Sequence, residues 1–92
     1  MEITVTVKRI EATKKVGNNE FQMRNLIVTT DEQYPQTLAI QFVQGKCVEL
    51  DKFQPNDKVK ISIDLRGREY TNDKGELVVF NTILGWKIEK VA

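Results

Sequence analysis

Apolar and polar side chains alternate with a period of two over most of the chain, which is the pattern of strands that bury one face. The clearest run is KVKISIDLRGREY, residues 58–70, in which Val59, Ile61, Ile63 and Leu65 fall on one face and mostly polar or charged side chains on the other. Four further runs have strand patterns: residues 2–10, 21–30, 37–43 and 77–88. These runs, in a chain of 92 residues, predict one all-β domain that spans residues 1–92.

Between the third and fourth strands, the segment QGKCVELDKF (residues 44–53) loses the period of two. Its apolar residues Cys47, Leu50 and Phe53 recur every three positions, which predicts one short helix with an apolar side. Three strands, a helix and a final hairpin are the order of the oligonucleotide/oligosaccharide-binding fold, or OB-fold. We therefore predict a five-stranded OB-fold barrel with one short helix between strands 3 and 4. We prefer it to an SH3-like barrel, because this helix is long enough to plug one barrel end.

Three polar segments interrupt the strand pattern. KKVGNNE (residues 14–20) carries turn residues, DEQYPQ (31–36) contains a proline that lacks a ladder donor, and TNDKGE (71–76) is a turn in which Gly75 is able to take positive φ. The alternation also slips near Asn25, which predicts a bulge or a bend in the second strand. Phe21 and Phe42 are expected in the core.

The residues needed for most enzymatic chemistry are missing. The sequence has no histidine, and its only cysteine, Cys47, falls on the apolar side of the predicted helix. The glycines are too scattered for a phosphate loop or a dinucleotide fingerprint. Asp31 and Glu32 are adjacent, so their carboxylates point apart rather than towards one metal ion. We expect no enzyme, no cofactor and no metal site.

Three features bear on the compartment. No apolar run approaches the roughly 20 residues that cross a bilayer, and the N-terminus MEITVTVKRI lacks the regions of a signal peptide. A single cysteine allows no intramolecular disulfide, which suits a reducing environment. We expect a cytoplasmic protein with no membrane partner.

Charge is nearly balanced, with 14 basic and 13 acidic side chains and a net charge of +1. A strongly basic domain would indicate a nucleic-acid partner, and this balance does not. Residues 1–30 and 58–92 each carry a net charge of +2, whereas residues 31–57 carry −3. The two ends of the chain are therefore expected to form a mildly positive surface.

The last hairpin combines cations with an aromatic side chain. If the alternation continues past Leu65, then Arg66, Arg68 and Tyr70 lie on one face, away from the core, and Lys74 lies at the turn. Cations interleaved with an aromatic platform suit a single nucleic-acid strand, because phosphates need positive charge and bases need flat surfaces. The alternative is a solvated hairpin whose field is largely neutralised by nearby acids: Glu69, Asp73 and Glu76.

Other candidates are less clustered. Lys8 and Arg24 are placed on the outer face of the first two strands, where they would add positive charge. Tyr34 is either a stacking platform or a local loop anchor beside Pro35. Trp86, near the C-terminus, is expected in the core or at an interface.

The final strand is apolar on both faces. One parity holds large apolar residues at 78, 80, 84, 86 and 88, and the other holds Leu77, Val79 and Ile83. A strand with one wet face would not expose so many apolar side chains. A loop or another subunit must cover the outer face, and we predict a homodimer or larger oligomer through this fifth strand.

The sequence also resembles a known family. The start MEITVTV, the stretch DEQYPQ, the helix entry at Gly45-Lys46 and the REY hairpin are similar to the family of small domains named DUF3127. Residues 44–91 resemble the second half of bacterial single-stranded DNA-binding proteins, whose hairpin has an R-x-Y/W-T pattern that Arg68, Tyr70 and Thr71 match.

The resemblance implies an OB-fold that binds single-stranded DNA. It places Tyr70 where the binding proteins carry a base-stacking aromatic, with Arg66 and Arg68 beside it, and it matches Lys46 to their lysine after glycine. Two positions depart from the pattern, because Gln44 replaces a frequent aromatic and Leu38 falls near a stacking tryptophan. With fewer platforms, binding is expected to be weaker than in those relatives.

Two functions therefore remain open. The first is non-catalytic, largely sequence-independent binding of single-stranded DNA in a replication, repair or phage context, with RNA as the alternative strand. Its proposed nucleic-acid-binding residues are Arg66, Arg68, Tyr70, Lys74, Lys46, Arg24 and Lys8. The second is a protein-interaction or oligomer-assembly module with no nucleic-acid role.

Overall fold

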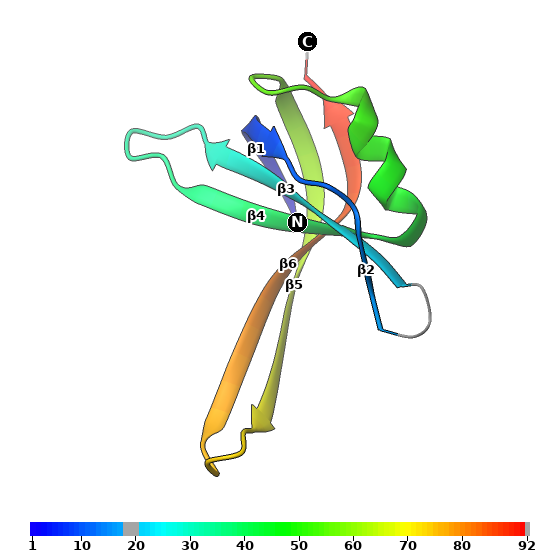
Figure 1. Cartoon of the computed structure of the whole chain (residues 1–92). Helices are drawn as coiled ribbons and strands as arrows, with labels where there is room; N and C mark the ends of the chain where they lie inside the picture. The colour runs from blue at the N-terminus through cyan, green and yellow to red at the C-terminus, as the bar shows by residue number, and fades with distance from the viewer. Residues whose placement is uncertain (18–20, 92) are drawn as a thin grey trace.

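A computed structural model describes residues 1–17 and 21–91. It contains six strands and one 3₁₀ helix, coloured along the chain in Figure 1: β1 (Glu2–Ile10), β2 (Lys14–Val16), β3 (Phe21–Thr30), β4 (Thr37–Val43), η1 (Gln44–Lys52), β5 (Lys58–Thr71) and β6 (Leu77–Lys90). The five long strands and the helix occur where the sequence predicts them. The short β2, which pairs with the start of β3, is not predicted, because residues 14–20 look like a turn.

The strands form one sheet in the order β1-β5-β6-β4-β3-β2. Strand β1 also pairs with β3, so the five long strands close into a ring. All pairs are antiparallel except the short contact between β4 and β6. Closure and the position of η1 between the third and fourth long strands confirm the predicted OB-fold.

The core lies inside this ring. Its fully or almost fully buried apolar side chains come from four strands and from η1: Val5, Val7, Leu26, Val28, Ile40, Phe42, Leu50, Val59, Ile61 and Ile63. Helix η1 lies across one end of the ring with Cys47 and Leu50 buried, and Phe53 packs beside them (Figure 1). The spacing of three therefore identified the buried side of the helix correctly.

Two β-bulges, one in β1 and one in β6, change which side chains of the strand point into the barrel. On β1, Lys8 is an extra residue between Val7 and Arg9, opposite Val28 and Ile27. On β6, Trp86 is extra, opposite the step from Ser62 to Ile63 on β5. The slip that the sequence shows near Asn25 therefore reflects consecutive buried residues in β3, and the bulge that accommodates them lies in the partner strand.

Two apolar residues expected inside are exposed. Leu65 has the same parity as Ile63 but is 66% exposed, because β5 and β6 run past the end of the barrel as a free hairpin (Figure 1). Phe21, at the first position of β3, is 37% exposed, because it also lies beyond the core. Both expectations were wrong for one reason: parity fixes a side chain's direction but not whether another layer covers it.

Among the described helices, none is long and apolar enough to cross a membrane.

One glycine tests the core packing directly. A Cβ atom at Gly85 would lie 2.5 Å from the ring of Phe42 and 2.9 Å from Ile40. We predict that Gly85→Ala lowers the free energy of unfolding by about 1–3 kcal/mol, because a close-packed core must shift to admit the methyl group. Urea denaturation measures this loss.

Gly45→Ala is the matched control, since no atom lies within 4 Å of a Cβ built there. Its unfolding free energy should stay within about 0.5 kcal/mol of the parent protein. Equal unfolding midpoints for the two variants would contradict the packing described around Phe42.

Candidate nucleic-acid interface

The turn of the β5–β6 hairpin sets the register of its two strands. The Asn72 side-chain oxygen accepts hydrogen bonds from the backbone N–H groups of Lys74 (2.9 Å) and Glu76 (3.0 Å). Gly75 takes φ of 78°, a left-handed conformation that favours glycine. This local geometry leaves Lys74 at the exposed tip and pairs Thr71 with Leu77.

One face of the hairpin is basic and aromatic. The register pairs Arg66 with Thr82, Arg68 with Phe80, and Tyr70 with Val78. Directly paired residues share a face, so the predicted row of Arg66, Arg68 and Tyr70 exists and Phe80 joins it. The rings of Tyr70 and Phe80 stack with centroids 5.5 Å apart and planes 10° apart, while the side chains stay 42% and 50% exposed.

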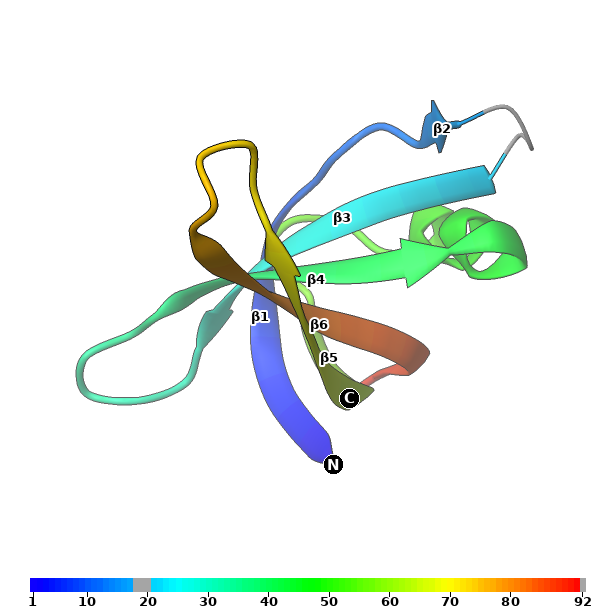
Figure 2. The same ribbon diagram turned by 90° about the horizontal axis from the view of Figure 1, so that it is seen from below.

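This face of the hairpin borders a groove of about 710 Å³, which we call the aromatic groove. Its floor is the outer face of β3 and β4, and its walls are the hairpin and the first residue of β3. The lining residues are Phe21, Met23, Gln41, Val43, Arg66, Gly67, Arg68, Phe80 and Thr82. Figure 2 shows the hairpin projecting from the barrel towards the viewer, beside the outer side of β3 and β4.

Sequence reasoning missed three contributors to this surface. Phe21 was expected in the core, and neither Phe80 nor Lys14 was considered as part of the site. Lys14 pairs with Met23, so the two side chains share the face that lines the groove. The hairpin register alone could have identified Phe80, because a turn over residues 72–76 puts Phe80 opposite Arg68.

Cations on the parts of β5 and β6 that belong to the barrel are mostly neutralised. Lysines of β5 and β6 pair with acids there: Lys58 with Asp31 (3.1 Å), Lys60 with Glu2 (3.6 Å), Lys87 with Glu89 (3.0 Å) and Lys90 with Asp57 (3.7 Å). Hydrogen bonds from Lys58 and Thr6 lower the pKa of Asp31, and the hydrogen bond from Lys87 lowers the pKa of Glu89. These surface pairs add little stability, but they cancel positive charge locally.

The cations near the hairpin are different. Among residues 1–17 and 21–91, no carboxylate pairs with Arg68, Lys74 or Lys14, and Arg66 has only a long contact of 3.5 Å with Asp64. Several cations without a close carboxylate partner therefore lie beside the aromatic groove, although the net charge is only +1. Within the described residues Lys8 and Lys52 also lack an ion pair, so such cations are not confined to the groove.

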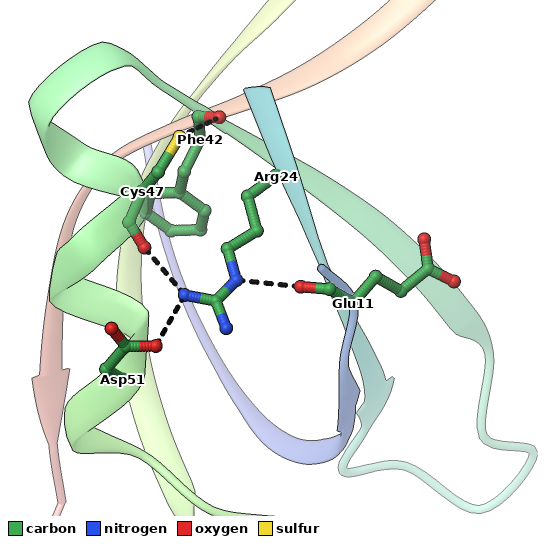
Figure 3. A network of polar contacts seen from close by, with 5 residues as sticks. All are labelled: Glu11, Arg24, Phe42, Cys47 and Asp51. Atoms are coloured by element: carbon green, nitrogen blue, oxygen red, sulfur yellow. Dashed lines mark hydrogen bonds and ion pairs between the residues drawn. The ribbon is translucent and has the colours of Figure 1, made fainter. Parts of the chain in front are cut away.

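Arg24 has another role. It shares the parity of Leu26 and Val28, and its guanidinium lies under η1 (Figure 3). Its Nε donates to the Glu11 carbonyl (2.7 Å), and its Nη1 donates to the Cys47 carbonyl (3.0 Å) and to Asp51 (2.7 Å). The side chain is only 15% exposed. The expectation of an outward cation was wrong, because β3 directs this residue towards the barrel end that η1 covers.

Cys47 belongs to the same network of polar contacts, and its thiol is buried there. The Cys47 thiol donates to the Phe42 carbonyl (3.4 Å), and burial raises the pKa of the thiol. A buried, protonated thiol is a poor nucleophile. Within the described part of the chain, no group of three His, Cys, Asp or Glu side chains could hold a metal ion.

The remaining candidates lie outside the aromatic groove. Lys46, on η1, pairs with Glu49 at 3.5 Å, and Lys8 is the exposed bulge residue of β1. Tyr34 is 75% exposed, so of the two alternatives the packed loop anchor is wrong. Trp86 is half exposed at the bulge of β6.

These features define an OB-fold protein: the five long strands close into a ring, a helix covers one end, and a hairpin lies beside the outer face of β3 and β4. The family model described as "Domain of unknown function (DUF3127)" matches residues 2–89, so the chain belongs to that family. No curated protein matches the chain.

Solved structures show the same fold at low identity. The mitochondrial single-stranded DNA-binding protein Rim1 from S. cerevisiae has a TM-score of 0.75 and 11% identity, over 99% of this chain and 92% of that chain. A small single-stranded DNA-binding protein from Streptomyces coelicolor has a TM-score of 0.63 and 12% identity, with the same coverage of both chains. At such identity the likeness establishes the fold alone.

The Arg24 network yields a stability prediction. Arg24→Met keeps most of the side-chain volume but leaves the Glu11 and Cys47 carbonyls without their donor. We expect the free energy of unfolding to fall by about 2 kcal/mol or more, since unpaired polar groups near the core are costly. Guanidinium denaturation measures the change.

Arg9→Met is the control, because Arg9 makes only an exposed ion pair with Glu11 at 3.7 Å. Its effect should stay within about 1 kcal/mol. If Arg24→Met unfolds at the same denaturant concentration as Arg9→Met, the network does not hold η1 against β3.

Proposed function

We propose that this protein binds single-stranded DNA in the aromatic groove, without catalysis, in the cytoplasm and in a replication, repair or phage context. The observation that carries the proposal is the stacked pair of Tyr70 and Phe80 beside Arg66 and Arg68, at the edge of an open groove. Sequence-tolerant binding of single strands requires this combination of flat platforms and cations. The fold shared with the two single-stranded DNA-binding proteins supports it.

The proposal gives each residue a role. Tyr70, Phe80 and Phe21 offer ring faces or edges on which bases stack. Arg68, Arg66, Lys74 and Lys14 hold phosphates. Lys46 and Lys8 lie outside the groove and contribute long-range attraction, whereas Arg24, which is committed to η1, is left out of the site.

A binding titration tests this proposal. Fluorescence anisotropy of a labelled oligothymidine should rise with protein in low salt, and affinity should fall steeply as salt is added. With three or four phosphate contacts, the slope of log affinity against log salt should be about −2 to −3. Absence of binding at tens of micromolar protein in low salt would refute the proposal.

Substitutions on the two faces of the hairpin locate the site. Phe80→Ala and Tyr70→Ala should each weaken binding by about 1–3 kcal/mol, because each removes a stacking platform. Val79→Ala is the matched control: Val79 neighbours Phe80 on the same strand but pairs with Glu69 on the other face. Loss of binding in Val79→Ala alone would move the site to that face.

A second proposal concerns assembly. On the other face of the hairpin, Leu65, Leu77 and Val79 are exposed by 66%, 69% and 60%. Apolar side chains gathered on one exposed face favour a protein contact. We propose that a second copy of the chain covers the end of this face near the hairpin turn, at Leu77 and Val79, and leaves the stem around Leu65 open.

Light scattering measures that assembly. The protein should be a dimer or a larger oligomer, and Leu77→Lys with Val79→Lys should give a monomer that still binds oligothymidine, because the aromatic face is unchanged. A parent protein that remains monomeric at high concentration would contradict the assembly proposal but not the strand-binding proposal.

A further inference from the structure

A second hollow adjoins the aromatic groove at the stem of the hairpin. It has a volume of about 750 Å³ and shares five lining residues with the aromatic groove: Met23, Gln41, Arg66, Gly67 and Thr82. Its other wall comes from the opposite face of the hairpin, where Leu65 pairs with Ile83. A strand lying in the aromatic groove therefore passes directly beside this hollow.

Three side-chain amides line this hollow, which we call the amide pocket. Asn25 on β3 and Gln41 on β4 are directly paired and share the outer face of the sheet. Asn81 reaches the pocket from β6, opposite Gly67. A Cβ atom at position 67 would lie 3.2 Å from the Asn81 side-chain oxygen, so the glycine leaves room for this amide.

The amides have hydrogen-bonding capacity to spare. The Gln41 amide donates only a weak contact to the Met23 sulfur at 3.5 Å. The side chains of Asn25 and Asn81 have no hydrogen bond to another described residue. Each amide offers one acceptor oxygen and two donor hydrogens. Leu65, Ile83 and Ala39 provide apolar surface beside them, and no carboxylate lines the pocket.

This lining suits a flat heterocycle with both donors and acceptors on its edge. Apolar surface accommodates the ring, and paired donor and acceptor groups read the edge. Side-chain amides of Asn and Gln match adenine in particular, because they bond its N6 amino group and N7 at the same time. The absence of a carboxylate in the lining disfavours a cation or an amine.

We propose that the amide pocket takes one base of the bound strand and selects adenine. The inference rests on the proposed function, and it changes one part of it: binding is not fully independent of sequence. Selectivity arises because a base with the wrong edge leaves the pocket's amides unpaired after their water has been displaced.

The test compares oligothymidine with strands of the same length that carry one central adenine, cytosine or guanine. A single substitution avoids the self-stacking of an all-adenine strand. By anisotropy at low salt, the adenine strand should bind about fivefold or more tighter than oligothymidine. Making the same strands as RNA shows which backbone presents the base, and adenine preference in at least one backbone is the expected result.

Gln41→Met, which is close in shape but has no amide, should abolish the preference for adenine. Asn81→Ala should also abolish the preference, and it should leave the affinity for oligothymidine unchanged, because Asn81 lies on the exposed hairpin and lines the amide pocket but not the aromatic groove. Gln33→Met, on the exposed loop after β3, is the control and should keep the preference.

Equal affinity for all four strands, on both backbones, overturns the inference while leaving the proposed function intact. Preference for guanine also overturns it, because Arg66 would then be the reading group. If no strand binds, the proposed function itself fails. Nitrogen-15 NMR with adenosine monophosphate then tests separately whether the amide pocket binds adenine. Shifts of the Asn25, Gln41 and Asn81 side-chain amide resonances support adenine binding, and unchanged resonances refute it.

Discussion

Strand β1 pairs along both of its edges, and the rest of the structure depends on this double pairing. Val5 is paired with Thr30 of β3 on one side and with Val59 of β5 on the other. The double pairing closes the sheet, so that the apolar faces of the five long strands point into the barrel and η1 covers one end. Because closure removes exposed strand edges within the ring, a ligand must be held by side chains of the outer face and by what projects from it.

The β5–β6 hairpin projects from the barrel, and this projection explains why both of its faces carry exposed side chains of distinct kinds. A two-stranded ribbon has no second layer, so both of its faces remain accessible. One face carries cations and stacked aromatic rings, and the other carries Leu65, Leu77 and Val79. The ion pairs of Lys58, Lys60, Lys87 and Lys90 neutralise cations elsewhere on β5 and β6, so a nearly neutral chain still presents positive charge beside the groove.

Local patterns predicted the local features correctly. Strand alternation and the spacing of Cys47, Leu50 and Phe53 gave the fold, and continued alternation past Leu65 placed Arg66, Arg68 and Tyr70 on one face. Features that depend on distant partners could not be predicted in this way. Whether Phe21 is covered depends on where the barrel ends, and the partners that cover Arg24 lie on η1, more than twenty residues later. The amide pocket likewise brings together amides from three strands, β3, β4 and β6, which meet because the barrel closes.

The most direct measurement is photo-crosslinking of a bromodeoxyuridine-containing oligothymidine, with the crosslinked residues identified by mass spectrometry. Of the exposed aromatic side chains, Phe21, Tyr70 and Phe80 lie at the aromatic groove or beside it on the hairpin, whereas Tyr34 and Trp86 lie elsewhere. The proposed site predicts crosslinks to Tyr70 and Phe80, and to Phe21 on the opposite wall. Crosslinks confined to Tyr34 or Trp86 would show that the strand binds another surface.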